Sequence, residues 1–255
     1  MISTLGLPRR LAAEFLGTAL LVTLVVGSGI AAARLSPGDV GLQLLENSTA
    51  TVFGLAVLIL LFGPISGAHF NPVVTAADWV LGRRSGTGIS AGHAGAYTLA
   101  QITGGVVGAW LANLMFDHPV FELSGKDRVS MGHLVGEVVA TAGLIAVIFA
   151  LARTGRAGLS AAAVGAYIGA AYWFTSSTSF ANPAVTIGRM FSDSFAGIAP
   201  GSVPGFIAAQ IAGALIGLGW IAVLYPDAAR TAADVVVPRH GDQSTHVDAD
   251  HRSSP

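Results

Sequence analysis

Long stretches without a charged residue alternate with short polar segments along most of this chain. A helix needs roughly 20 apolar residues to cross a bilayer, so this pattern predicts several membrane-spanning helices. The stretches without charge, or with a single Glu, cover residues 11–33, 47–77, 85–116, 129–152, 157–188 and 194–226. We expect six spans, at about residues 11–33, 43–62, 91–115, 132–152, 159–176 and 203–225.

Two of the uncharged stretches, 47–77 and 157–188, are too long for one span and too short for two. In each, a segment rich in Gly or Ser leads to Asn followed by Pro, at Asn71–Pro72 and Asn182–Pro183. Asn is a favoured N-cap and Pro is favoured at the first helical position. Each pair therefore predicts a short helix that starts inside the membrane. Irregular backbone at that depth is tolerated only inside protein or along a water-filled cavity, so the two loops predict a lumen.

The same landmarks occur twice in the same order, about 109 to 123 residues apart. Each repeat, at about 8–116 and 129–225, holds three spans, and an odd number forces the second repeat to run inverted across the membrane. The two Asn-Pro loops are therefore expected to meet near the midplane, an arrangement typical of membrane transport proteins. The paired landmarks are Glu14 with Glu137, Asn71 with Asn182, and Gln101 with Gln210.

Composition supports a membrane protein and excludes several other classes. Hydrophobic residues make up 53% and charged residues 11% of the chain, whereas soluble domains carry about 25% charged residues. The net charge of -1 leaves no basic surplus for nucleic-acid binding. Cysteine is absent, and no catalytic constellation is visible. We therefore expect no enzyme, no cofactor and no metal site.

The distribution of Lys and Arg predicts the orientation. Nine of these 13 residues fall on one side of a six-span arrangement, which by the positive-inside rule places both termini in the cytoplasm. Residues 1–226 are expected to form one channel-like domain in the bacterial inner membrane. Residues 227–255 are polar and are expected to form a disordered cytoplasmic tail.

Three motifs resemble the aquaporin and aquaglyceroporin family, the major intrinsic proteins. They are the run Ser66–Pro72, the triplet Asn182–Ala184, and Glu14 within its helix. The resemblance covers about residues 8–225. It implies an all-α membrane fold with six transmembrane helices and two re-entrant half-helices, assembled as a homotetramer in the lipid bilayer. It also implies a passive channel for small neutral solutes, with the half-helices starting at Pro72, Val73, Pro183 and Ala184.

The chain departs from the family where the pore usually narrows. The family's constriction carries an arginine three residues after the second Asn, and here that position is Val185. Distances from the two Asn residues give the other constriction positions as Thr51, Ala170 and Ser179, although the first two assume no gap and allow a slip of one or two residues. Val73 is another departure, because the family usually has Ala there.

Small side chains at these positions predict a wide opening. Glycerol-like polyols or undissociated arsenous acid would then pass as well as water, and the pattern of Val185 and Phe70 resembles the bacterial branch associated with arsenic resistance. A water-selective channel is the alternative within the family. A proton-coupled carrier and a non-conducting structural protein of the same fold are alternatives from other classes.

Five further polar residues are candidates for function. His69 is expected to line the pore, with packing inside its loop as the alternative. Glu14 and Glu137 either brace the loops by accepting backbone hydrogen bonds, which we favour, or relay protons. Asp78 is expected at the inner mouth. Arg189 is expected to reach the headgroups or to pair with Asp193, with a place at the outer mouth of the pore as the alternative.

Overall fold

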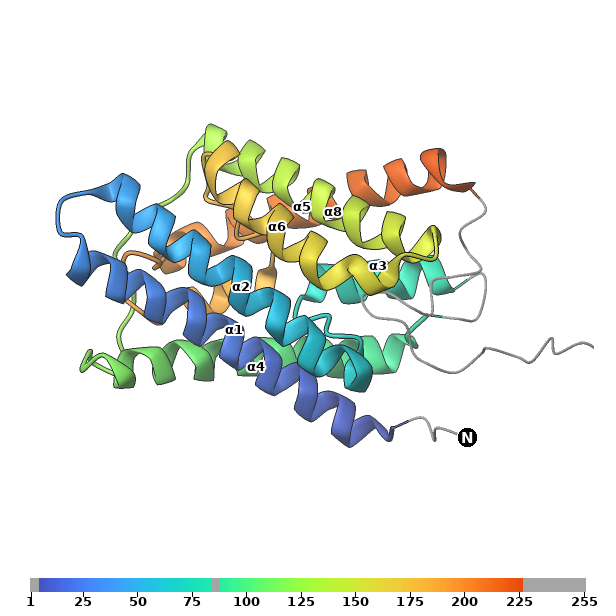
Figure 1. Ribbon diagram of the computed structural model, residues 1–255, viewed down its shortest axis with the longest axis horizontal. Helices are drawn as coiled ribbons and strands as arrows, with labels where there is room; N and C mark the ends of the chain where they lie inside the picture. The colour runs from blue at the N-terminus through green and yellow to red at the C-terminus, as the bar shows by residue number, and fades with distance from the viewer. Residues whose placement is uncertain (1–4, 84–87, 227–255) are drawn as a thin grey trace, which may run out of the picture.

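The computed structural model describes residues 5–83 and 88–226, which are helical apart from turns and loops, with no strand in these ranges (Figure 1). The predicted disordered tail, residues 227–255, lies outside the described residues. The α-helices are α1 (Leu7–Leu35), α2 (Val40–Ser66), α3 (Pro72–Gly82), α4 (Ala91–Met115), α5 (Met131–Arg153), α6 (Ser160–Phe174), α7 (Pro183–Arg189) and α8 (Val203–Leu224). Two short 3-10 turns, Ala157–Leu159 and Pro200–Ser202, precede α6 and α8.

The helices form two halves with the same order of long and short elements. Within the halves, α1 packs against α2 and α4, and α5 packs against α6 and α8. Between the halves, α2 packs against α6, the short α7 against α4, and the short α3 against α8. Figure 1 shows the long helices running side by side along the length of the molecule. The predicted fold of six long helices and two half-helices is confirmed.

Five helical segments are long and apolar enough to cross a membrane by length and composition. The sixth long helix, α4, has 25 residues but is not among them. Its Gly, Gln and Asn residues lower its hydropathy, and its buried positions are the ones that carry several of these residues. The polar character of α4 thus reflects its contacts with α1 and α7.

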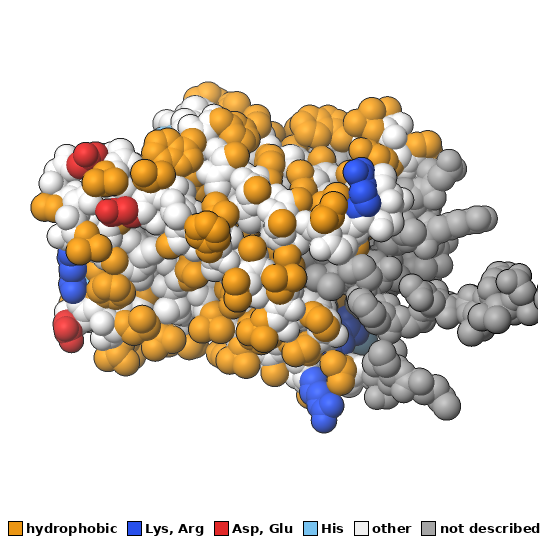
Figure 2. Space-filling view, viewed as in Figure 1, with side chains coloured by type: hydrophobic (Ala, Val, Ile, Leu, Met, Phe, Trp, Pro, Cys, Tyr) orange, Lys and Arg blue, Asp and Glu red, His pale blue; other side chains and the backbone are white. Residues whose placement is uncertain are grey.

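The charged side chains on the face shown in Figure 2 lie near the two ends of the molecule, and apolar side chains cover the area between them. Large exposed apolar residues occur on most of the long helices, including Phe53 on α2, Leu99 on α4 and Trp220 on α8. An apolar belt between two charged ends matches the environment of a bilayer.

Paired glycines allow the close crossings within each half. A Cβ on Gly108 of α4 would lie 2.2 Å from the Ala19 carbonyl oxygen of α1. At the matching place in the second half, a Cβ on Gly217 of α8 would lie 2.6 Å from the Ala142 carbonyl oxygen of α5. Only glycine lets the two backbones approach this closely, and the two crossings are related by the sequence repeat.

The boundary of α2 differs from the expected span at residues 43–62. The helix continues through Pro64 to Ser66 and ends at Gly67, whose φ is 92° and whose N–H donates to the Gly63 oxygen at 2.9 Å. Pro64 removes one backbone donor in the last turn, and Gly67 supplies the left-handed cap that stops the helix. This ending places the loop 67–70 directly against the start of α3.

Candidate functional site

The two short helices begin next to each other, each at an asparagine. The Asn71 Oδ1 atom accepts the Val73 N–H at 3.1 Å, and Asn182 Oδ1 accepts the Ala184 N–H at 2.9 Å. Each Nδ2 donates to the other loop, from Asn71 to the Ala181 oxygen at 2.8 Å and from Asn182 to the Phe70 oxygen at 2.8 Å. Because an amide nitrogen carries two hydrogens, each Asn keeps a second hydrogen for another acceptor.

A buried carboxylate holds the loop before each short helix. Glu14 accepts hydrogen bonds from the N–H groups of His69 at 3.0 Å and Phe70 at 2.7 Å, and from Ser66 Oγ at 2.6 Å. Glu137 accepts the N–H groups of Phe180 at 2.8 Å and Ala181 at 2.9 Å. Both carboxylates are fully buried.

A glutamine and a threonine complete the same network in each half. Gln101 Nε2 donates to Glu14 at 2.7 Å and to Thr75 Oγ1 at 3.0 Å. Its counterpart Gln210 donates to Glu137 at 2.6 Å and to Thr186 Oγ1 at 2.8 Å. Each threonine hydroxyl then donates to the oxygen of the Asn that starts its helix. Sequence reasoning did not assign the two threonines, although each is the fifth residue of its Asn-Pro motif.

The loops adopt backbone conformations that side chains other than glycine rarely take. Ala68 and Phe70 have φ values of 49° and 50°, and Ser179 and Ala181 have φ values of 51° and 49°. Such residues cost about 1–3 kcal/mol each. The hydrogen bonds to the buried carboxylates offset this cost and hold the loops in place.

A narrow cavity of about 60 Å³ runs past both asparagines. Because about 10–15 Å³ of such space is enough for one water molecule, the cavity has room for more than one. One part of its wall is apolar, formed by residues of α1, α2, α5 and α6 such as Leu21, Ile59, Leu144 and Ile168. The predicted residues that line it are Thr51, His69, Asn71, Ser179, Asn182, Val185 and Arg189.

The structure corrects the position expected on the fifth span. Ala170 is exposed on the outside of α6, and it is Tyr172, two residues later, that lines the cavity together with Val164 and Ile168. Residues four apart share a face of a helix, whereas Ala170 points elsewhere. The Tyr172 hydroxyl lies 3.2 Å from Thr51 Oγ1, and both residues line the cavity. An aromatic side chain therefore occupies a wall that the sequence predicted to be small.

Arg189 also lies elsewhere than expected. It is 2% exposed, and its guanidinium carbon lies 3.4 Å from the centroid of the Phe180 ring. Its Nε donates to the Ala196 oxygen. The expected pairing with Asp193 is wrong, because no ion pair joins the two among the described residues, and the Asp193 carboxylate accepts the N–H of Gly125 at 3.0 Å. Arg189 cannot reach the headgroups from this position, and it contributes to the cavity wall instead.

The structure also shows the contacts and burial of three other predicted residues, Asp78, His69 and Val73. Asp78 is buried, and its Oδ2 accepts the Ile89 N–H at 3.0 Å. Among the described residues it does not line the cavity, and its place at the inner mouth stays a prediction. His69 Nδ1 lies 3.0 Å from Thr75 Oγ1. Val73 is buried, and its bulk does not separate the half-helices, since the two asparagines still bind the opposite loops.

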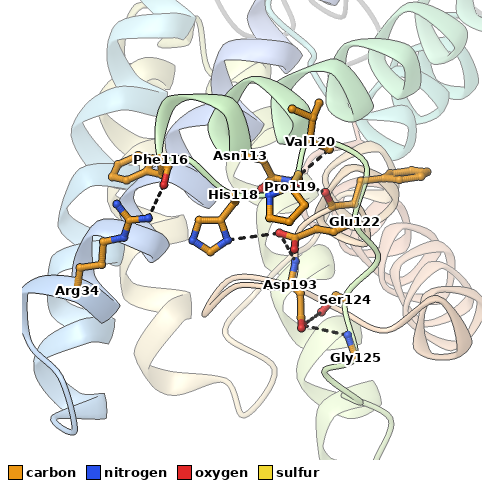
Figure 3. A network of polar contacts seen from close by, with 11 residues as sticks. Arg34, Asn113, Phe116, His118, Pro119, Val120, Glu122, Ser124, Gly125 and Asp193 are labelled. Carbon is orange, nitrogen blue, oxygen red and sulfur yellow. Dashed lines mark hydrogen bonds and ion pairs between the residues drawn. The ribbon is translucent and has the colours of Figure 1, made fainter.

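A polar network ties the segment after α4 to the segment after α7 (Figure 3). Asn113 Nδ2 donates to the Phe191 oxygen at 2.9 Å. Glu122 accepts the Asp193 N–H at 3.1 Å and lies 3.5 Å from His118 Nδ1. Sequence reasoning missed this network, because its members come from two loops without a shared motif.

Three cations gather beside this network, and each donates to the short segment 195–197. Lys126 Nζ donates to the Phe195 oxygen at 2.9 Å, and Arg128 Nε donates to the Gly197 oxygen at 2.7 Å. Arg189 binds the oxygen between them. Burial, with smaller contributions from the two arginines, lowers the pKa of Lys126 to about 8. Burial also lowers the pKa of Arg128 to about 10. Within residues 5–83 and 88–226 no cluster of metal-ligating side chains occurs.

Comparisons with known proteins agree with this geometry. The family model described as "Major intrinsic protein" matches residues 1–181. Aquaglyceroporin AqpS of Rhizobium meliloti (strain 1021) is 47% identical over 212 residues, which is 83% of this chain and 88% of that protein. Aquaporin Z of Photorhabdus laumondii is 34% identical over 177 residues, covering 62% of this chain and 71% of that protein.

A solved structure has the same fold. The crystal structure of the aquaglyceroporin from Plasmodium falciparum superimposes with a TM-score of 0.63 and 20% sequence identity. The match covers 87% of this chain and 98% of that one.

Proposed function

The chain belongs to the major intrinsic protein family, and we propose that it is a passive channel for water and glycerol-like polyols. Members of this family are channels, so the chain is a multi-pass membrane protein and not an enzyme. The observation that carries the proposal is the cavity that passes between two asparagine-capped half-helices and has one polar and one apolar wall.

The half-helices explain how such a channel excludes ions. Each helix N-terminus carries roughly half a positive charge, and the two ends meet at Asn71 and Asn182. A cation or proton that approaches them is repelled, whereas a neutral solute accepts hydrogen bonds from the two free amide hydrogens. The contacts are few enough for the solute to leave again, which conduction requires.

The residues beyond the asparagines favour solutes larger than water. Thr51, Ser179 and Val185 are small, and the 47% identity to a protein named an aquaglyceroporin supports glycerol-like solutes. We include undissociated arsenous acid, a small neutral hydroxide, as a further candidate solute. A water-selective channel is the alternative, and it is favoured by the position of Tyr172, which narrows the same region.

The hydrogen bonds of Glu14 and Glu137 favour a role in bracing the two loops over a role in proton relay. Each accepts two loop N–H groups and a glutamine amide. Among the described residues neither lines the cavity, so a proton would have to leave a fully bonded site to reach the solute path. A proton-coupled carrier is therefore the weaker proposal.

We further propose that the domain of residues 1–226 resides in the bacterial inner membrane as a homotetramer, with both termini in the cytoplasm. The excess of Lys and Arg on the side of the termini supports the orientation. The exposed apolar residues of α1 and α2 offer surface for a neighbouring subunit as well as for lipid.

Stopped-flow light scattering of proteoliposomes tests the function. Vesicles that contain the protein should shrink and re-swell in a glycerol gradient faster than empty vesicles, and they should also pass water. A matched variant, Val185→Trp, places a large ring in the cavity wall and should lose both fluxes. Fast water flux with glycerol flux at the level of empty vesicles would identify a water-selective channel. Solute accumulation driven by a proton gradient would identify a carrier.

A further inference from the structure

The cavity contains an arginine and an aromatic residue, although neither stands at the position where the family carries it. Val185 occupies the position of the family's arginine, yet Arg189, four residues later, lines the cavity. Ala170 is exposed, yet Tyr172 lines the cavity. We propose that Arg189 and Tyr172 form a displaced selectivity filter that rejects cations and binds hydroxyl-bearing neutral solutes. This inference rests on the proposed function as a neutral-solute channel.

The position of Arg189 leaves most of its donors to the cavity. Its Nε donates to the Ala196 oxygen, and one face of the guanidinium rests on the Phe180 ring. Among the described residues, the one hydrogen bond that its side chain donates is that from Nε to the Ala196 oxygen, although the residue is 2% exposed. A buried guanidinium with unused N–H groups is costly unless something accepts them. A solute oxygen or a water in the cavity is the acceptor that the site offers.

The hydrogen bonds of Tyr172 determine what it presents to a solute. The Thr51 hydroxyl has one hydrogen, and it donates that hydrogen to the Asn47 oxygen at 2.8 Å. The contact of 3.2 Å between the two hydroxyls is therefore a bond in which Tyr172 donates to Thr51. The tyrosine oxygen then keeps its acceptor lone pairs for the cavity, where a solute O–H group has few other partners.

The two residues together match a polyol. Arg189 offers donors and Tyr172 offers an acceptor in the same cavity, and each hydroxyl of a polyol both donates and accepts. Ser179 Oγ, which lines the same cavity, has no partner among the described residues and adds a third polar group. An inorganic cation has no donor for Tyr172 and is repelled by Arg189.

The displacement also sets the order of polar and apolar sections along the cavity. Four residues of helix rise about 6 Å, so the cation lies about one turn beyond the family's position. Val185 occupies the section between Arg189 and Asn182 and leaves it apolar. We therefore infer a polar filter at the outer end, followed by an apolar section before the two asparagines.

A neighbouring arginine provides a matched control. Arg128 donates to the Gly197 and Phe195 oxygens, and its guanidinium carbon lies 5.3 Å from the centroid of the same Phe180 ring. It carries the same charge at the same end of the molecule, but it does not line the cavity within the described residues. A change at Arg128 therefore alters the local potential without removing a donor from the solute path.

The experiment compares Arg189→Leu, Arg189→Gln, Tyr172→Phe and Arg128→Gln in proteoliposomes. Water, glycerol and erythritol fluxes are measured by light scattering, and proton leak by an internal pH-sensitive dye. We expect Arg189→Leu to raise proton leak about tenfold, because the charge that repels cations is lost. It should also lower glycerol and erythritol flux relative to water, because the solute loses a hydrogen-bond donor. Tyr172→Phe should lower glycerol flux several-fold relative to water without a leak, and Arg128→Gln should behave as the unchanged protein.

The outcomes separate this inference from the proposed function. If the unchanged protein passes neither glycerol nor water, the function itself is wrong. The other case is that the unchanged protein passes both glycerol and water. If Arg189→Leu and Tyr172→Phe then keep its ratio of glycerol flux to water flux and its low proton leak, the displaced filter is wrong. Arg189→Gln keeps an amide donor and covers the case in which Arg189→Leu does not fold, since loss of charge alone should still raise the leak. An equal rise in proton leak in Arg128→Gln and Arg189→Gln would show that the leak depends on the total positive charge at this end of the molecule. That result would also refute the displaced filter.

Discussion

Replacing Glu14 by Gln tests whether the buried carboxylate braces the loop before α3. The carboxylate accepts four hydrogen bonds, from Ser66, His69, Phe70 and Gln101. In either orientation of a glutamine amide, its NH₂ group faces the N–H of His69 or of Phe70. An opposed buried donor costs about 1–3 kcal/mol, and the remaining bonds lose the roughly twofold strengthening that a charge provides. We expect a total loss of about 3 kcal/mol, or roughly 150-fold in the ratio of folded to unfolded protein.

Size-exclusion chromatography in detergent measures the folded yield, and thermal unfolding measures the loss of stability. Glu46→Gln is the control, because Glu46 is only partly buried and has one hydrogen bond, from Ser36 Oγ at 2.8 Å. We expect Glu14→Gln to lose most of its folded yield and Glu46→Gln to keep it. A Glu14→Gln protein that folds in normal yield and shows altered dependence of flux on a proton gradient would refute bracing and support a proton relay.

Three more predictions concern the pore, the helix crossing and the outer segment. Val185→Arg should reduce glycerol flux more than water flux in proteoliposomes, because it adds a large, donor-rich side chain to an apolar part of the cavity wall. Equal loss of both fluxes would argue against a selective role for this position. Gly108→Ala should destabilise the protein by about 1–3 kcal/mol through overpacking, because the new Cβ would lie 2.2 Å from the Ala19 oxygen. The melting temperature should fall accordingly. Gly92→Ala is the control and should leave the melting temperature unchanged, because Gly92 has open space around it. Lys126, the one lysine of the chain, has a lowered pKa and loses its charge as the pH rises through about 8 rather than 10.5. A membrane-impermeant amine reagent should therefore label it from outside intact cells with a midpoint near pH 8; labelling only in inverted vesicles would reverse the proposed orientation.

Much of the architecture was predictable because its signals are local or periodic. Asn followed by Pro predicts the start of a helix wherever it occurs, and both Asn71 and Asn182 do start helices. The matched pairs of Glu and Gln residues predicted an inverted repeat, and the two carboxylates accept equivalent bonds in the two halves.

The composition of the filter region was not predictable in the same way. The position on α6 was predicted by counting residues back from Asn182 across a loop, which does not reveal where α6 ends or how it is rotated. The predicted residue was therefore Ala170, whereas Tyr172 lines the cavity. The outer network of Figure 3 was missed for a related reason. Its partners, such as Glu122 and Asp193, come together only after two loops fold against each other.

The amino-acid sequence by itself determined that this chain has six long helices and two short helices that start at Asn71 and Asn182 inside an inverted repeat, because caps, periodicity and charge depend on neighbours along the chain. Only the tertiary structure decided what surrounds the solute path. Burial of Arg189 against Phe180, and the bond from Tyr172 to Thr51, depend on the relative rotation of helices that are distant in sequence. A shift of one residue in that rotation moves a side chain by about 100° around its helix, which separates a filter residue from one that faces lipid.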